Sequence, residues 1–160
     1  MKNIVHSEDV PAVDLARGKF GSRRRRLSVA AGGSKLGCSL FEIPPGKRAF
    51  PFHYHVVNEE AFYVLEGTGR LRFGAEEHEV VAGDYVCFPP GPECAHQLRN
   101  DGPGTLKILA MSTMSAPEIA YYPDSKKIGI LGERSPDGTL NVRLVRDEPS
   151  LGYYDGEEGE

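Results

Sequence analysis

A chain of 160 residues fits one compact domain and can enclose a core without disulfide bonds. Hydrophobic residues make up 39% of it and charged residues 26%, which excludes a wholly disordered or fibrous protein. The net charge of −4 argues against a nucleic-acid surface, because phosphate binding needs a basic face.

The first 26 residues are expected to form an irregular N-terminal extension. They end in four consecutive arginines, Arg23 to Arg26. Such a run is most often solvated or paired with acidic side chains, although it could also bind a phosphate or another protein. The next residues, LSVA at 27–30, resemble the edge of a strand.

Residues 27–115 are expected to form a series of short strands in a sandwich or closed barrel. Runs rich in Val, Ile, Leu, Phe and Tyr are separated by turn sequences such as PPG, AGD and NDGPG. The predicted strands cover residues 36–43, 50–55, 61–66, 69–73, 78–81, 85–88, 96–99 and 106–111. This regular spacing favours an all-β sandwich or closed barrel over alternating βαβ units.

Residues 116–160 are expected to form an irregular segment that covers the barrel, followed by a mobile acidic tail. Within them, SPDGT at 135–139 is a strong turn signal, and LNVRLV at 140–145 alternates apolar with polar residues. A further hairpin is therefore predicted there. No repeat or linker composition divides the chain, so we expect a single domain overall.

Cysteine usage and the N-terminus indicate a cytoplasmic protein. Cys38, Cys87 and Cys94 form an odd set without C-x-x-C spacing, and MKNIVHSEDVPAVD lacks the apolar core of a signal peptide. No stretch approaches the ~18 consecutive apolar residues of a membrane span. Cys94 lies two residues before His96, but we expect it to be a small semi-buried hydrophobic side chain.

Three histidines and one glutamate form a candidate metal site. His53 and His55 are two residues apart on a predicted strand and so share a face, Glu60 opens the next strand, and His96 begins a later one. Neutral imidazoles with one carboxylate suit a divalent transition metal such as Zn, Mn, Fe, Ni or Co. Taken alone, two histidines at this spacing are more often surface or hydrogen-bonded residues than ligands.

The spacing of these residues resembles the two cupin motifs. The first motif, G-x5-H-x-H-x(3,4)-E-x6-G, is similar to Gly46-x6-His53-x-His55-x4-Glu60-x6-Gly67, which has one additional residue after the first glycine. The second, G-x5-P-x-G-x2-H-x3-N, is similar to Gly83-x5-Pro89-x-Gly91-x4-His96-x3-Asn100, which has two residues inserted before the histidine. Both insertions fall in turns, where changes of length cost least.

The resemblance to the cupin superfamily implies a double-stranded β-helix, the jelly-roll barrel of cupins. It implies that His53, His55, Glu60 and His96 are the metal ligands. Glu60, rather than Glu59, keeps the six-residue spacing to the closing glycine, so Glu59 is expected to face away. The segments YYPDSKK at 121–127 and YYDGE at 153–157 are similar to tail elements of a branch of small bacterial cupins loosely labelled sugar-phosphate isomerase.

The resemblance leaves two functional hypotheses open. The first is a divalent-metal-dependent enzyme of isomerase or dioxygenase type that acts on a small oxygen-rich metabolite, such as a sugar derivative, keto acid or carboxylate. The second is a non-catalytic cupin that binds or senses a small molecule through its metal. The sequence assigns no catalytic or substrate-binding residue. The resemblance also implies a homodimer, and neither nucleic acid nor membrane is expected as a partner.

Some neighbouring side chains are better explained without a role in the site. Lys47 and Arg48 could attract an anionic substrate, but they are expected to be exposed bystanders. Four aromatic residues could line a pocket, although barrel core is the favoured explanation: Phe50, Phe52, Phe62 and Phe88.

Overall fold

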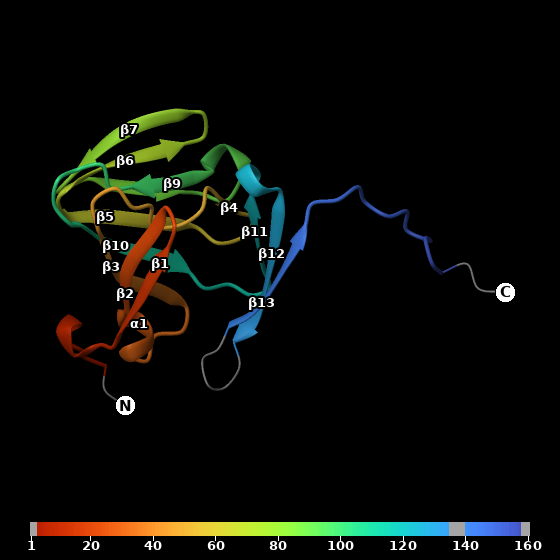
Figure 1. Ribbon diagram of the computed structural model, residues 1–160. Helices are drawn as coiled ribbons and strands as arrows, with labels where there is room; N and C mark the ends of the chain where they lie inside the picture. The colour runs from red at the N-terminus through yellow and green to blue at the C-terminus, as the bar shows by residue number, and fades with distance from the viewer. Residues whose placement is uncertain (1–2, 135–139, 158–160) are drawn as a thin grey trace.

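The computed structural model describes residues 3–134 and 140–157, which fold almost entirely as β-structure (Figure 1). The strands are β1 (Ala12–Arg17), β2 (Phe20–Arg26), β3 (Leu36–Ile43), β4 (Tyr54–His55), β5 (Glu60–Glu66), β6 (Thr68–Phe73), β7 (Glu76–Val81), β8 (Tyr85–Phe88), β9 (His96–Arg99), β10 (Leu106–Thr113), β11 (Glu118–Tyr122), β12 (Lys127–Arg134) and β13 (Leu140–Arg146). The helical elements of the described residues are α1 (Leu27–Ala30) and the 3-10 turns η1 (Ser7–Asp9), η2 (Pro92–Cys94) and η3 (Pro123–Ser125). No helix in these ranges is long and apolar enough to cross a membrane.

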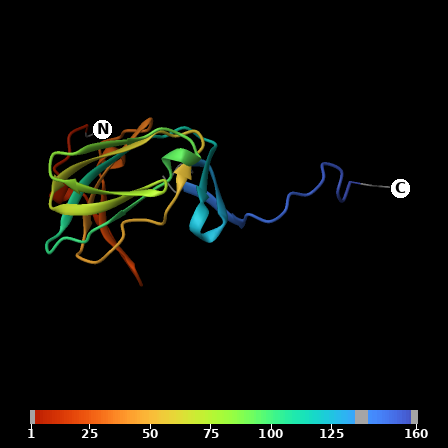
Figure 2. The same ribbon diagram turned by 90° about the horizontal axis from the view of Figure 1, so that it is seen from above.

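Antiparallel sheets surround the interior. In the described part of the chain, the largest sheet has the strand order β1-β2-β3-β10-β5-β8, a second has β13-β12-β11-β4 and a third has β7-β6-β9. Figures 1 and 2 show the β7-β6-β9 sheet and the β11-β12 strands on different sides of the molecule, and in Figure 1 β5 and β10 lie below the β7-β6-β9 sheet. Strands distant in sequence, such as β3, β10 and β5, are neighbours in the large sheet, so the all-β prediction is confirmed.

The strands of the central region follow the predicted pattern. β3, β8 and β9 have the predicted bounds, and β5, β6, β7 and β10 differ by no more than two residues at either end. The predicted strand at 50–55 is wrong over residues 50–53, because only Tyr54–His55 forms a strand. Pro51 has no N–H to donate to a ladder, and the carbonyl of Phe50 accepts a hydrogen bond from the side chain of Gln97 instead.

The terminal regions are more regular than predicted. Residues 12–26 were expected to be irregular, but they form the β1-β2 hairpin, and β2 pairs with β3. The strand edge predicted at 27–30 is wrong, since these residues form α1. On the C-terminal side, β11, β12 and β13 replace the expected irregular segment. β13 contains the predicted strand at 140–145, whereas the predicted turn at 135–139 lies outside the described residues.

Side chains along β5 alternate between the core and the solvent, and this alternation orients Glu60. In β5, Phe62 and Val64 are 2% and 0% exposed, whereas Tyr63 and Leu65 are 39% and 44% exposed. Glu60 has the same parity as Phe62, so its carboxylate points inward. The main core cluster consists of Ile43, Ala49, Phe62, Val64, Leu71, Val80, Phe88, Cys94, Leu98, Leu106 and Ile108.

Candidate metal centre

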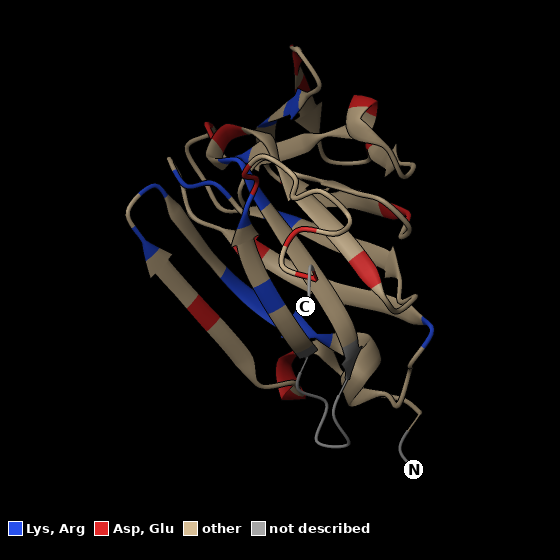
Figure 3. Cartoon of the chain, turned by 90° about the vertical axis from the view of Figure 1, so that its right-hand side faces the viewer, with Lys and Arg blue, Asp and Glu red and all other residues tan. Residues whose placement is uncertain are grey.

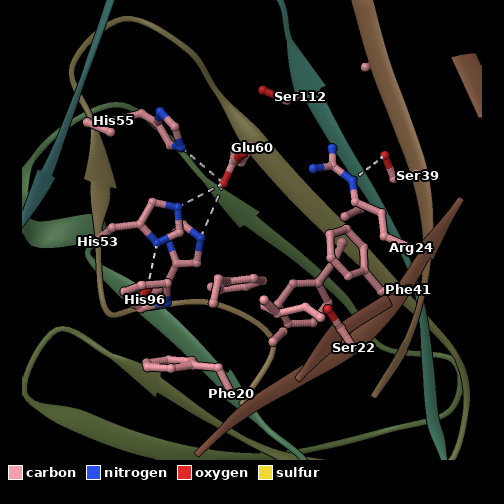
Figure 4. Close-up of a pocket in the computed structure, with 18 of the residues that line it drawn as sticks. Phe20, Ser22, Arg24, Ser39, Phe41, His53, His55, Glu60, His96 and Ser112 are labelled. Atoms are coloured by element: carbon pink, nitrogen blue, oxygen red, sulfur yellow. Dashed lines mark hydrogen bonds and ion pairs between the residues drawn. The ribbon is translucent and has the colours of Figure 1, made fainter. Parts of the chain in front are cut away.

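The four predicted ligands come together from the ends of three strands (Figure 4). An isolated antiparallel bridge joins His53 to His96, in which each backbone N–H donates to the other residue's carbonyl, at 3.1 and 2.8 Å. His96 opens β9 and His53 directly precedes β4, so His55 lies two residues further along the same segment. Glu60 opens β5 and faces these rings. We call these four residues the histidine cluster.

One carboxylate oxygen lies among the three imidazoles. Oε2 of Glu60 is 3.7 Å from Nε2 of His53, 3.4 Å from Nε2 of His55 and 3.4 Å from Nε2 of His96. Donor atoms that share one metal ion, with bonds of about 2.0–2.2 Å, lie about 3–3.5 Å apart, so these spacings fit a metal. The donor atoms of His53, Glu60 and His96 all lie within 4.8 Å of one another, and His55 lies outside this tighter group although it reaches Glu60.

Backbone carbonyl groups fix the tautomer of two histidines. Nδ1 of His53 lies 2.9 Å from the carbonyl oxygen of Pro51, and Nδ1 of His96 lies 3.0 Å from that of Cys94. Because a carbonyl only accepts, each Nδ1 donates, and the Nε2 lone pair is left for a ligand beside Glu60. This is the usual arrangement of a metal-binding imidazole. Cys94 thus contacts the cluster through its carbonyl, while its side chain packs in the core as predicted.

Burial and charge act in opposite directions within the cluster. Burial favours a raised pKa for Glu60, but the contacts with the three histidines hold its pKa well below the ordinary value. Burial lowers the pKa of His96 despite the nearby carboxylate. Burial also acts to lower the pKa of His55, but Glu60 and then Glu118 outweigh it and raise that pKa. The lowered pKa values of Glu60 and His96 favour the anionic carboxylate and the neutral imidazole that metal binding requires, whereas at His55 the raised pKa makes a proton compete more strongly with a metal.

A second carboxylate, which the sequence analysis missed, organises the loop between His55 and Glu60. Glu118 is 2% exposed and accepts hydrogen bonds from the backbone N–H groups of residues 56–58, at 2.5–3.3 Å, and of Ile119, at 2.8 Å. Its Oε1 lies 3.7 Å from Nδ1 of His55. That nitrogen is buried and makes no hydrogen bond within the described chain. Glu118 thus fixes the loop that sets the two predicted ligands, His55 and Glu60, relative to each other.

Aromatic rings form the walls around the imidazoles. Phe88 stacks on His96 with ring centroids 3.7 Å apart, and Phe50 lies edge-on to His53 and His96 at 5.2 and 5.6 Å. Tyr122, which the sequence analysis also missed, lies parallel to His53 at 5.9 Å. Burial, and then the charge of Glu60, raises the pKa of Tyr122, so its phenol stays protonated.

The histidine cluster faces a cavity of about 980 Å³. Among its lining residues are three of the four phenylalanines singled out in the sequence: Phe50, Phe62 and Phe88. These rings belong both to the core and to the cavity wall. Lys47 and Arg48 are not among the described residues that line it, which agrees with their expected bystander role. Nζ of Lys47 instead donates to the carbonyl of Gly18.

Both motif segments fall within the part of the chain that matches a known family. Residues 39–112 match the Cupin_2 family, described as a cupin domain. This chain contains a cupin domain. The cupin resemblance and the barrel fold predicted from the motifs are therefore confirmed.

Two solved cupin structures are similar over most of the chain. A sugar phosphate isomerase of the cupin superfamily from Silicibacter pomeroyi is 25% identical, with a TM-score of 0.78 over 95% of this chain and 98% of that one. A structure from Acidithiobacillus ferrooxidans, named provisionally for the same activity, is 26% identical, with a TM-score of 0.77 over 89% of this chain and 92% of that one. An uncharacterized protein from Methanocaldococcus jannaschii is 37% identical over 70 residues, which are 44% of this chain and about half, 54%, of that relative.

Proposed function

We propose that this cupin is a divalent-metal-dependent enzyme acting on a small oxygen-rich metabolite, with isomerisation of a sugar derivative as the first candidate reaction. The observation that carries the proposal is the position of the histidine cluster on the wall of a cavity of about 980 Å³. Structural metal sites are usually closed by protein ligands, whereas catalytic ones keep a position open. A cavity of this size is sufficient for a small metabolite. The names of the two similar structures support the choice of isomerisation.

The residues of the chain have distinct roles in this proposal. His53, His55, Glu60 and His96 hold the metal, and the bound ion supplies a Lewis acid for an oxygen atom of the metabolite. Phe88 stacks on the imidazole of His96, so it fixes the ring and keeps water from that side of the site.

Tyr122 has a separate role in the proposal. Its ring lies parallel to that of His53 at the cavity wall, and its protonated phenol offers a hydrogen-bond donor for orienting the bound molecule.

Metal content and turnover, measured on one batch of the full chain, test the proposal. We expect protein purified without added metal or imidazole to contain about one transition-metal ion per chain. We also expect it to interconvert aldose and ketose sugar phosphates, followed by NMR, and to lose this activity when a chelator removes the metal. Saturable binding of these compounds without any turnover would instead favour the non-catalytic binding module.

Two neighbouring glutamates provide a matched comparison for the metal site. Glu60→Gln removes the carboxylate that lies among the imidazoles, so metal content should fall, whereas Glu59→Gln should leave it unchanged. Each change removes one negative charge, and the two positions are adjacent in the sequence. The two side chains differ in the face of the strand to which they point. The reverse result would contradict the strand register on which the metal site is built.

A further inference from the structure

The outer face of the β7-β6-β9 sheet carries a row of arginines. Arg70 of β6 lies directly opposite Arg99 of β9, and an isolated antiparallel bridge places Arg48 opposite Arg99. Arg72 points to the same face as Arg70, because side chains two residues apart on a strand share a face. Like charges directly opposite each other on neighbouring strands repel, so this register is unfavourable unless negative charge lies close to the row.

These arginines surround a hollow of about 240 Å³, which we call the arginine hollow. Among the described residues, its lining consists of four arginines, one glutamine and one glutamate: Arg48, Arg70, Arg72, Arg99, Gln97 and Glu77. Pockets for drug-sized ligands usually measure about 300–1,000 Å³, so this hollow suits a small ion or a single charged group. Four cationic side chains against one carboxylate favour an anion there, although the whole chain has a net charge of −4.

Neighbouring groups orient the guanidinium planes without enclosing them. Nε of Arg70 donates to Asp101 at 3.1 Å. Nη1 of Arg72 donates to both carboxylate oxygens of Asp124 at 2.9 Å, and its guanidinium carbon lies 3.5 Å from the ring centroid of Phe52. The side chains of Arg70 and Arg72 are nevertheless each 37% exposed. Both are therefore held in position and still accessible to an anion from solvent.

Gln97 separates the arginine hollow from the histidine cluster. Gln97 is 5% exposed, and its Nε2 donates to the carbonyl of Phe50 at 2.9 Å. His96, the preceding residue, points to the other face of β9, where its Nε2 lies 3.4 Å from Glu60. The two sites thus lie on opposite faces of one strand, and binding at the hollow does not depend on the proposed function.

We propose that the four arginines of the arginine hollow form a binding site for a phosphate group. A phosphate monoester carries about 1.5–2 negative charges at neutral pH and three strong acceptor oxygens. It can therefore accept hydrogen bonds from guanidinium groups on different strands at the same time. Its charge also offsets the repulsion between Arg70 and Arg99, which face each other across the strand pair. The group belongs to free phosphate or to a small phosphorylated molecule whose remaining atoms extend into solvent.

The arginine run of β2 supplies a matched control for this site. Figure 3 shows basic residues gathered on β2, next to β1. Arg24 of this run lines the large cavity, whereas Nε of Arg23 lies 3.9 Å from Asp14 and 4.0 Å from Glu42, as expected for a run paired with acidic side chains. Nη2 of Arg99 likewise lies 3.6 and 3.9 Å from two carboxylates. Arg23 is not among the described residues that line the arginine hollow.

Titration calorimetry on the full chain, after treatment with a chelator, tests the site with inorganic phosphate and glycerol phosphate as probes. Arg99→Gln removes the central charge of the row and should weaken binding of the tighter probe by about tenfold or more, whereas Arg23→Gln should leave it unchanged. Tighter binding of inorganic phosphate would identify the free ion as the ligand, and tighter binding of glycerol phosphate a phosphorylated metabolite. Either result supports the site.

A second variant keeps the test decisive if Arg99→Gln folds poorly. Glu77→Gln removes the carboxylate that lines the hollow, and the side chain of Glu77 is 51% exposed, so this variant should fold and bind the probe several-fold more tightly. The proposal is overturned if neither probe binds the wild type saturably, or if Arg99→Gln and Arg23→Gln weaken binding equally. A Glu77→Gln variant that binds no more tightly than the wild type would also overturn it.

Discussion

Replacing Glu118 by glutamine should loosen the loop between the proposed metal ligands His55 and Glu60. The Oε1 atom accepts three backbone N–H groups and Oε2 accepts a fourth, from Asn58 at 2.5 Å. An amide can keep the first three bonds without the help of a charge, but its NH2 group would face the N–H of Asn58. Hydrogen bonds to charged groups contribute about 1.5–3 kcal/mol, and a buried N–H without a partner costs about 1–3 kcal/mol. We therefore expect Glu118→Gln to lose about 3 kcal/mol of stability.

Two measurements distinguish a positioning role for Glu118 from a purely structural one. A loss of this size lowers Tm by about 6–12 °C for a chain of this length, which differential scanning fluorimetry can detect. Because the loop joins His55 to Glu60, metal affinity measured well below Tm should also fall, by about 10–100-fold. Glu59→Gln, which changes a neighbouring exposed carboxylate, is the control. A Glu118→Gln variant that melts early but binds metal like the wild type would refute the positioning argument.

Three further predictions follow from the same contacts. His96→Ala should remove most of the bound metal, as elemental analysis can establish, and full metal stoichiometry in this variant would contradict the four-ligand site. Asn100→Ala should cost about 2–4 kcal/mol in chemical denaturation but leave metal content intact, because its buried amide bridges the carbonyls of Ile43 and Gly104. Burial acts to lower the pKa of His55, but Glu60 outweighs it and raises that pKa, so His55 keeps its proton to a higher pH than an ordinary histidine. Metal binding at His55 must displace this proton. Calorimetric metal affinity should therefore weaken as the pH falls below that raised pKa, by up to about tenfold per unit, and an affinity independent of pH would exclude this proton.

The site could be predicted where residue spacing and strand parity act together. His53 and His55 share a face because they are two residues apart on a strand. Glu59 and Glu60 are adjacent, so the same alternation turns their side chains to opposite faces. The fold brings Nε2 of each histidine within 3.4–3.7 Å of Oε2 of Glu60. The backbone bridge between His53 and His96 that helps to do this could not be read from the sequence, although the second motif placed His96 on a strand.

The missed residues lacked such a signal. Glu118 acts on backbone N–H groups about 60 residues earlier, and any residue can present an N–H, so no side-chain pattern marks its partners. Tyr122 reaches His53 only because β11 pairs with β4. The hairpin of residues 12–26 was missed because Val13 and Leu15 are exposed and four arginines conceal the alternation of β2.

The two ends of the cavity depend on the same geometric rule. A shift of one residue in β5 would turn Glu60 away from the imidazoles, and the same shift in β2 would exchange Arg24 for Arg23. Cross-strand pairing fixes both registers, through Glu60 opposite Phe88 and Arg24 opposite Phe41. The aromatic side chains that pack beside the cavity therefore hold the carboxylate and the guanidinium on the same interior.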